Sequence, residues 1–225
     1  MKTVLIGIFA FAIAANAQIT LTKRTITTTG TATVAATPDK ADVQLGVTTQ
    51  AVTAQDASTQ NAAQVSSVLN AIRGVLGANA SIKTISYTLS AIYNNPPQGQ
   101  TAVVVGYVAT NIVDATMTDL TLVGKVIDAG IGAGANRVQG ITFGLQNPDP
   151  VQQQALKAAA AAALTQAKTI ASGLGVNVGN VLQASQGGSI SSGTVLAGVA
   201  AAPTTPIEPG AIQVSASVTI QVEIT

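Results

Sequence analysis

Alternating apolar and polar residues predict most strands of this chain. Thr25–Val34 and Ala41–Val47 alternate threonine or charged residues with apolar ones, and Thr37–Asp39 separates them. A period of two places such side chains on opposite faces of a strand, so we expect two antiparallel strands joined by a short turn. Ser81–Tyr93 and Thr101–Ala115 repeat the pattern around the turn NNPPQGQ, which predicts a long hairpin with a Pro-rich tip.

Three further segments near the C-terminal half of the chain have the composition of strands. They are Val138–Leu145, Val176–Ser185 and Ile212–Ile224, and the last has the clearest alternation in the chain.

Helical periodicity appears first between Val65 and Leu76. Apolar residues recur there at spacings of three and four, Thr53 and Asp56 form an N-terminal capping pair, and glycines at 74 and 77 end the pattern. These signals predict an amphipathic helix.

Two more helices follow. One begins near Asp119 and ends among the glycines at 130, 132 and 134. The other opens at Asn147-Pro148-Asp149, passes through the alanine block Ala158–Ala163 and ends at Gly173. Because alanine lets a neighbouring backbone approach closely, we expect this last helix to lie flat on a sheet.

The predicted order of elements is ββα-ββα-βα-ββ, an α+β fold of antiparallel sheet with packed helices. Residues 187–210 interrupt it with a long Gly/Ser/Ala/Pro segment. Unstructured loops of that length are uncommon in a compact domain, so this segment is either disordered or an arm that docks on something. The apolar middle, Val195–Ala202, favours docking.

The first residues have the organisation of an export signal. Lys2 precedes the apolar run Val4–Ala14, and Ala15-Asn16-Ala17 is a small-x-small cleavage site. We therefore expect residues 1–17 to be a signal peptide and residues 18–225 to form the mature domain, located in the periplasm or outside the cell. A retained membrane anchor is the alternative, but the run is shorter than a spanning helix requires.

Charge narrows the classes of partner. The chain has 10 basic and 9 acidic residues, and loss of Lys2 with the signal leaves a neutral protein. This balance disfavours nucleic acid as a partner, because nucleic-acid binding uses a basic surface. Charged residues make up only 8% of the chain. A weakly charged, neutral surface resists self-association poorly, although a soluble envelope protein with polar uncharged surfaces is equally compatible.

The residue types leave little material for catalysis. The chain has no histidine and no cysteine, which excludes the usual triads, thiolate nucleophiles and zinc sites. Ser-Lys or carboxylate-pair chemistry remains open, but Asp39 and Asp42 are the only close acidic pair, and we expect them on a solvated turn with their side chains apart. We therefore assign no catalytic, cofactor-binding or metal residues and expect no cofactor.

Two motifs are suggestive of ligand binding. Gly130–Ala135 fits the dinucleotide pattern G-x-G-x-x-A, but the glycines end a predicted helix instead of opening one, so we interpret them as a helix stop. Tyr87 and Tyr93 on one predicted strand, with Tyr107 on its partner, form a conceivable aromatic binding face. Cross-strand tyrosines more often stabilise a sheet.

Three stretches carry a family resemblance: residues 29–50, 134–145 and 206–224. The residues of these stretches, and their order along the chain, resemble the SIMPL-domain family of bacterial periplasmic proteins. The resemblance implies an α+β domain exported to the envelope, with some members that assemble into rings or channels and others linked to oxidative-stress tolerance. It supplies no catalytic residues. Asn136 and Arg137 match a family signature, and we expect Arg137 to bridge the helix end and the strand.

The low charge, the alanine-rich third helix and the apolar arm depart from the family pattern. Our leading hypothesis is an exported, non-catalytic protein that forms a homo-oligomer through sheet edges, the segment Gln18–Thr29 or the 187–210 arm. The alternative is a soluble periplasmic binding or stress-protection module, in which the loops NNPPQGQ and GGSISSGTVLAGV enclose a small ligand or a client chain. A pocket lined by Tyr87, Tyr93 or Tyr107 would support it. An enzyme is the third and weakest interpretation.

Overall fold

The computed structural model describes residues 24–77, 80–94, 97, 101–194, 207 and 209–225. Its helices and strands are β1 (Thr25–Ala36), β2 (Lys40–Ala51), α1 (Ala54–Leu76), β3 (Ser81–Tyr93), β4 (Val104–Met117), the 3₁₀ turn η1 (Leu120–Leu122), α2 (Val123–Gly132), β5 (Arg137–Gly144), α3 (Asp149–Gly173), β6 (Val178–Thr194) and β7 (Ile212–Ile224). The predicted α+β class and order of elements are confirmed. The predicted signal peptide, residues 1–17, and residues 18–23 lie outside the described residues.

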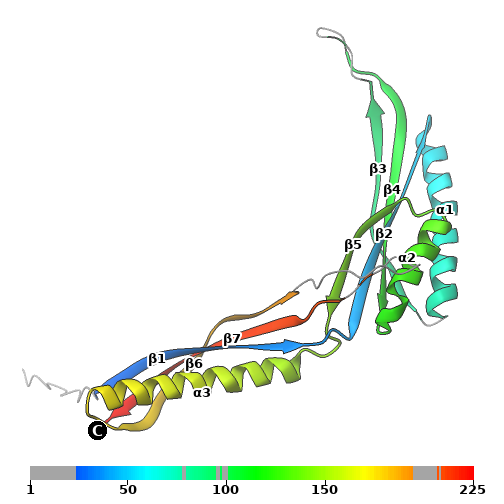
Figure 1. The fold of residues 1–225 in the computed structure, drawn as a ribbon. Helices are drawn as coiled ribbons and strands as arrows, with labels where there is room; N and C mark the ends of the chain where they lie inside the picture. The colour runs from blue at the N-terminus through cyan, green and yellow to red at the C-terminus, as the bar shows by residue number, and fades with distance from the viewer. Residues whose placement is uncertain (1–23, 78–79, 95–96, 98–100, 195–206, 208) are drawn as a thin grey trace, which may run out of the picture.

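The strands form two antiparallel sheets. Sheet A has the order β1-β7-β6, and sheet B has the order β3-β4-β2-β5. Each sheet carries its helices on one face, α3 on sheet A and α1 with α2 on sheet B, and the two parts meet at an elbow (Figure 1).

The expected hairpin between the first two strands is wrong. β1 pairs along its whole length with β7, from the other end of the chain, whereas β2 pairs with β4 and β5. Alternation defines the two faces of a strand but does not specify its partner, and the residues Thr37–Asp39 form the elbow between sheets instead of a hairpin turn.

The sixth strand is longer than the sequence indicates. It continues to Thr194, where it pairs with Ile212, so the first residues of the expected 187–210 loop belong to a ladder with β7. Ile207 packs partly buried against the core of sheet B. The apolar stretch 195–202 lies outside the described residues.

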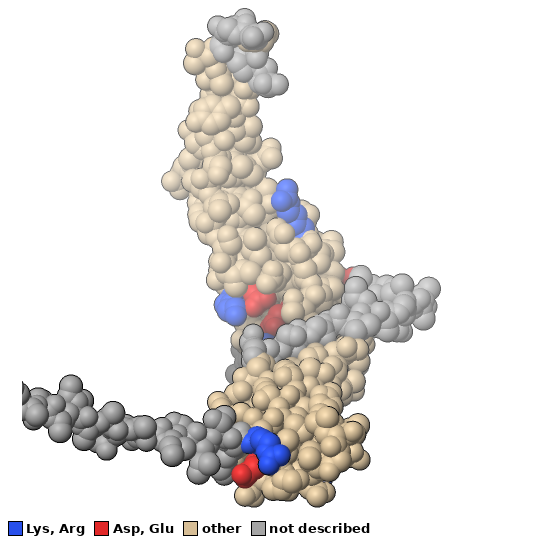
Figure 2. Space-filling view, turned by 90° about the vertical axis from the view of Figure 1, so that its left-hand side faces the viewer, with Lys and Arg blue, Asp and Glu red and all other residues tan. Residues whose placement is uncertain are grey.

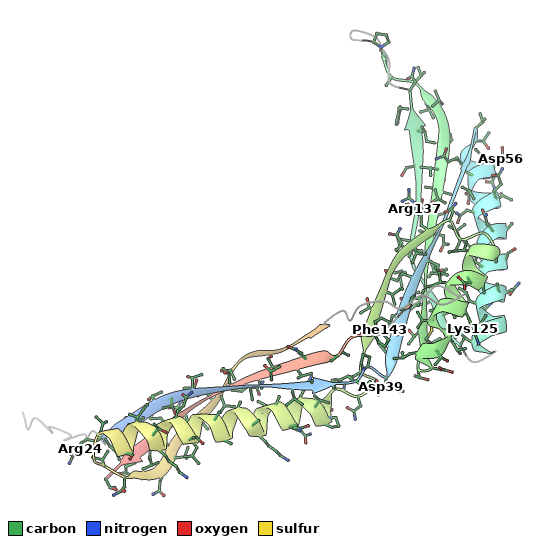
Figure 3. The ribbon with its side chains drawn as sticks, viewed as in Figure 1. Arg24, Asp39, Asp56, Lys125, Arg137 and Phe143 are labelled. Carbon is green, nitrogen blue, oxygen red and sulfur yellow. The ribbon has the colours of Figure 1, made fainter. Side chains whose placement is uncertain are left out.

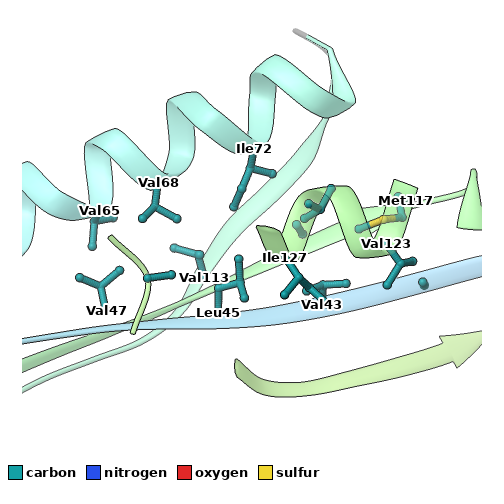
Figure 4. Packing of buried hydrophobic residues seen from close by; sticks show 14 of the residues in the cluster. Val43, Leu45, Val47, Val65, Val68, Ile72, Val113, Met117, Val123 and Ile127 are labelled. Carbon is teal, nitrogen blue, oxygen red and sulfur yellow. The ribbon is translucent and has the colours of Figure 1, made fainter. Parts of the chain in front are cut away.

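Branched and long apolar side chains fill the core of sheet B (Figure 4). Val43, Leu45 and Val47 of β2 alternate inward and are fully buried against Val68 and Ile72 of α1. Burial of each such side chain contributes roughly 1.5–3 kcal/mol relative to its exposed state. The predicted start of α1 is confirmed, because the Thr53 side chain accepts a hydrogen bond from the Asp56 N–H at 3.1 Å.

The core of sheet A is built differently. The buried residues of α3 are alanines at every fourth position, namely Ala155, Ala159, Ala163, Ala167 and Ala171. They lie against Ile26, Val214 and Val222 of β1 and β7. The helix comes so near that a Cβ added at Gly30 would overlap backbone atoms of Ala159 and Ala163. The expected flat, alanine-mediated packing of this helix is confirmed.

Hydrogen bonds join two connecting segments at the elbow between the sheets, where Asp39 lies (Figure 3). The Asp39 N–H donates to Gly144 O at 3.1 Å, and the Asp39 carboxylate accepts from the Gln146 N–H at 2.6 Å. The link between β1 and β2 is thereby tied to the link between β5 and α3.

Candidate functional site

The hairpin of β3 and β4 projects beyond the helices that cover sheet B (Figure 1). Its outer end is closed by the Asn94 N–H, which donates to Val103 O at 3.0 Å, and by the Val103 N–H, which donates to Asn94 Oδ1 at 2.7 Å. We call residues 84–94 and 101–113 the hairpin arm. The arm confirms the predicted long hairpin.

No charged residue occurs between Thr84 and Val113. The large apolar side chains that the arm exposes are Ile85, Tyr87, Leu89, Tyr93, Val103, Val104 and Val105. Figure 2 shows the corresponding part of the molecular surface without acidic or basic groups. Large apolar side chains that gather on one exposed element, without charges among them, are typical of an interaction surface.

The three tyrosines have different surroundings. The Tyr87 hydroxyl donates to Ser58 Oγ of α1 at 3.0 Å, and Tyr107 is half-buried opposite Ala91. Tyr93 is 60% exposed and follows an irregularity in the β3–β4 register. The hollows beside Lys168 and Val176, beside Leu76 and Leu122, and between Thr27 and Gln183 are lined by other residues than tyrosine. Tyr87 therefore fixes the arm to α1, whereas Tyr93 belongs to the exposed surface.

The face of sheet A opposite α3 carries Glu223, opposite Thr25, at one end and otherwise presents mostly neutral hydrogen-bonding side chains. They are Thr27, Thr29, Thr31 and Thr33 on β1, Ser215, Ser217, Thr219 and Gln221 on β7, and Gln183 and Ser185 on β6. Several pair with one another, as Thr29 with Thr219 at 2.8 Å and Thr33 with Ser215 at 2.9 Å. The hydroxyl pairs of this face offer packing and hydrogen bonding.

Four charges gather on the outer face of sheet B. Lys40 Nζ lies 3.0 Å from Asp42 Oδ2, and Lys83 Nζ lies 3.4 Å from Asp114 Oδ2. Thr116 Oγ1 also donates to Asp42 Oδ1 at 2.6 Å. Burial would raise the pKa of Asp42, but the hydrogen bond from Thr116 and the Lys40 ammonium outweigh it and hold the pKa below its ordinary value.

Asp114 is almost fully buried, and its Oδ1 has no hydrogen-bond partner. The two acids and two lysines balance, so the set consists of one salt bridge within β2, Lys40 with Asp42, and one between β3 and β4, Lys83 with Asp114. Among the described residues no group of three or more acidic side chains is arranged to hold a metal ion. Sequence reasoning missed the Lys83–Asp114 pair because only the register of β3 on β4 brings these residues together.

The acidic pair and the glycine motif that the sequence singles out have separate structural surroundings. Asp39 and Asp42 have separate partners, at the elbow and on sheet B, so their side chains do not act as a pair, as expected. Asp42, however, is a partly buried residue of β2 and does not lie on a solvated turn. The glycine motif ends α2: Gly134 has φ +116°, and the Ala135 N–H donates to Gly130 O at 2.9 Å before β5 begins. The interpretation as a helix stop is confirmed.

The residue that bridges the end of α2 to the sheet is Asn136. Its Nδ2 donates to Thr48 O at 2.7 Å, and its Oδ1 accepts from the Thr48 N–H at 3.0 Å. The side-chain amide thus continues the β2–β5 ladder by one step. Arg137, for which we expected this role, is an exposed residue of β5 opposite Gly46.

No helix among the described residues is long and apolar enough to cross a membrane.

Comparison with known proteins places the chain among relatives with little assigned chemistry. Residues 26–222 match the model of the SIMPL family, described as a protein of unknown function (DUF541). The chain is 30% identical over 186 residues to the 26 kDa periplasmic immunogenic protein of Brucella melitensis biotype 1, which covers 81% of this chain and 74% of that protein. It is 28% identical over 156 residues to the uncharacterized protein YggE of Escherichia coli K12, which covers 69% of this chain and 63% of that protein. Neither name states an enzymatic activity, and the first gives a periplasmic location.

Proposed function

This chain belongs to the SIMPL family, and we propose that it is an exported, non-catalytic protein of the periplasm that self-associates into a higher-order oligomer through its hairpin arm. The observation that carries the proposal is the arm itself: a projecting hairpin, uncharged from Thr84 to Val113, that exposes apolar side chains to solvent. An envelope location is supported by the N-terminal sequence and by the name of the Brucella relative.

The arm has properties that favour association over solvation. Leu89 is 42% exposed and Tyr93 60% exposed, so covering them removes apolar surface from water at roughly 25 cal/mol per Å². β3 is also an edge strand of sheet B, with backbone donors and acceptors free along one side. A second copy can therefore bury side chains and extend the sheet in the same contact.

The test uses protein exported to and purified from the periplasm, with its mass in solution measured by size-exclusion chromatography with light scattering. The wild type is expected to be an oligomer at tens of micromolar. The double variant Leu89→Lys/Tyr93→Lys places two charges on the arm and is expected to shift the protein to monomer. Ile131→Lys is the matched control, because Ile131 is 50% exposed at the end of α2, away from the arm, and should leave the oligomer intact.

A wild-type protein that stays monomeric at high concentration would overturn the proposal. Electron micrographs of the same sample distinguish rings, tubes and fibres, which fixes the form of the assembly.

Export is tested separately. Mass spectrometry of the periplasmic protein is expected to give a chain that begins at Gln18, and recovery of the uncleaved chain in the cytoplasm would contradict the proposed location.

A further inference from the structure

One strand of sheet A lacks the cover that the other two have. α3 packs on β1 and β7, where Val222 and Ile220 are buried on the helix side. Their partners on β6 lie on the same face, because directly paired residues share a side of the sheet. Yet Val181, opposite Val222, is 52% exposed, and Ala184, opposite Ile220, is exposed as well.

The uncovered strand is also an edge. β6 ends the order β1-β7-β6, so its backbone is unpaired along one side. Residues 178–187 contain no charge, and Leu182, at the register irregularity between Val181 and Gln183, is 41% exposed. Charged or inward-turned residues are the usual protection of an edge strand, and this stretch has no charged residue to supply it.

We propose that this part of β6, residues 178–187, receives the hairpin arm of a second copy of the chain, so that copies join head to tail. The inference rests on the proposed function and identifies the other half of its contact. Three observations select this occupant. Both surfaces are uncharged and expose large apolar side chains, both contain an edge strand, and they lie at opposite ends of the bent molecule, so they cannot meet within one chain (Figure 1).

Because the two surfaces differ, the contact is heterologous. Each copy then keeps one free arm and one free β6 after joining a neighbour, and growth continues until a ring closes or a fibre extends. Pairing of β6 with β6 of a second copy would instead stop at a dimer and leave Leu89 and Tyr93 of the arm exposed.

A mixing experiment separates these cases. The arm variant Leu89→Lys/Tyr93→Lys keeps an intact β6, and the β6 variant Val181→Lys keeps an intact arm. Each variant alone is expected to be monomeric, with self-association weakened at least about tenfold, which corresponds to about 1.4 kcal/mol. An equimolar mixture is expected to form one-to-one heterodimers and nothing longer, as measured by light scattering with one variant carrying a mass tag.

Each result has a defined meaning. Heterodimers in the mixture show that both variants are folded and that the two surfaces bind each other. If Val181→Lys assembles as well as the wild type, and Leu182→Lys does too, the inference about β6 is wrong while the proposed function stands. If both variants are monomeric and the mixture also stays monomeric, head-to-tail pairing is wrong. A monomeric wild type overturns the inference and the proposed function together.

Discussion

The two sheets of this protein hold their helices by opposite means. In sheet B, large side chains such as Leu45 and Ile72 fill a wide space between strand and helix. In sheet A, alanines at every fourth position bring α3 almost onto the strands, and Gly30 supplies the room. A core of large side chains adjusts to a substitution by repacking. Where the backbone of a helix lies against the backbone of a strand, there is no flexible side chain between them that can shift. The two sheets should therefore respond differently to the same kind of substitution.

The largest effect is expected from Gly30→Ala. The added Cβ would overlap Ala159 O and Ala163 N, which are backbone atoms in the middle of α3, so the helix must separate from β1. We expect a loss of at least about 4 kcal/mol in the free energy of unfolding, the range of exceptional core disruptions. Gly140→Ala on β5 is the control, because no atom lies within 4 Å of its added Cβ. Equal denaturant midpoints for the two variants would show that α3 does not lie this close.

In sheet B, a cavity should lower the free energy of unfolding, and a second substitution that fills it should partly restore the loss. Leu45→Ala is expected to lose about 3 kcal/mol of stability in urea unfolding. A Cβ added at Gly130 would meet the end of the Leu45 side chain, so Gly130→Ala should partly restore the Leu45→Ala variant although it destabilises the wild type. Additive losses in this double-mutant cycle would contradict the proposed fit between α2 and β2.

A smaller effect on stability is expected from a contact that both sheets share, a buried threonine hydroxyl that donates to a backbone carbonyl of the covering helix. Thr28 Oγ1 donates to Ala163 O of α3, and Thr49 Oγ1 donates to Ala57 O of α1, each at 2.8 Å and buried. Replacement by valine keeps the shape and removes the donor, so Thr28→Val and Thr49→Val should each lose about 1 kcal/mol. The exposed Thr31 provides the control, because Thr31→Val should change the thermal midpoint little. A clearly larger loss for Thr28→Val would mean that the close contact in sheet A depends on this bond.

Local pattern was enough to predict most of the individual elements, although not the full length of β6. The predicted bounds of β7, Ile212–Ile224, agree with the structure, and Thr53 caps α1 as expected. Both follow from interactions within a few residues. The pairing of β1 with β7 joins opposite ends of the chain, and no local signal distinguishes it from a hairpin with β2.

The candidate surfaces were less accessible to sequence reasoning. The alanine block Ala158–Ala163 predicts close packing of α3. The four-residue spacing from Ala155 to Ala171 is the more informative signal, because it defines a contact stripe longer than the block. That Leu89 and Val181 are exposed follows only from which strands the helices fail to cover. Periodicity shows that a side chain faces the helix side of a sheet but not whether a helix is there.

The smallest expected effect is a difference between the outer faces of the two sheets in how their contribution to folding stability depends on pH. The outer face of sheet A has hydroxyl pairs such as Thr29 with Thr219, which do not titrate, whereas sheet B has Asp42 with its lowered pKa. A carboxylate whose pKa is lower when folded contributes stability that is fully present above its unfolded pKa, about 3.9, and is lost as pH falls through the folded value. Asp42→Asn should therefore reduce stability at pH 7 and flatten its decline below about pH 4, measured by urea unfolding from pH 7 to pH 2. Thr219→Val should leave the shape of that pH profile unchanged, and an equal flattening in both variants would show that Asp42 is not the group responsible.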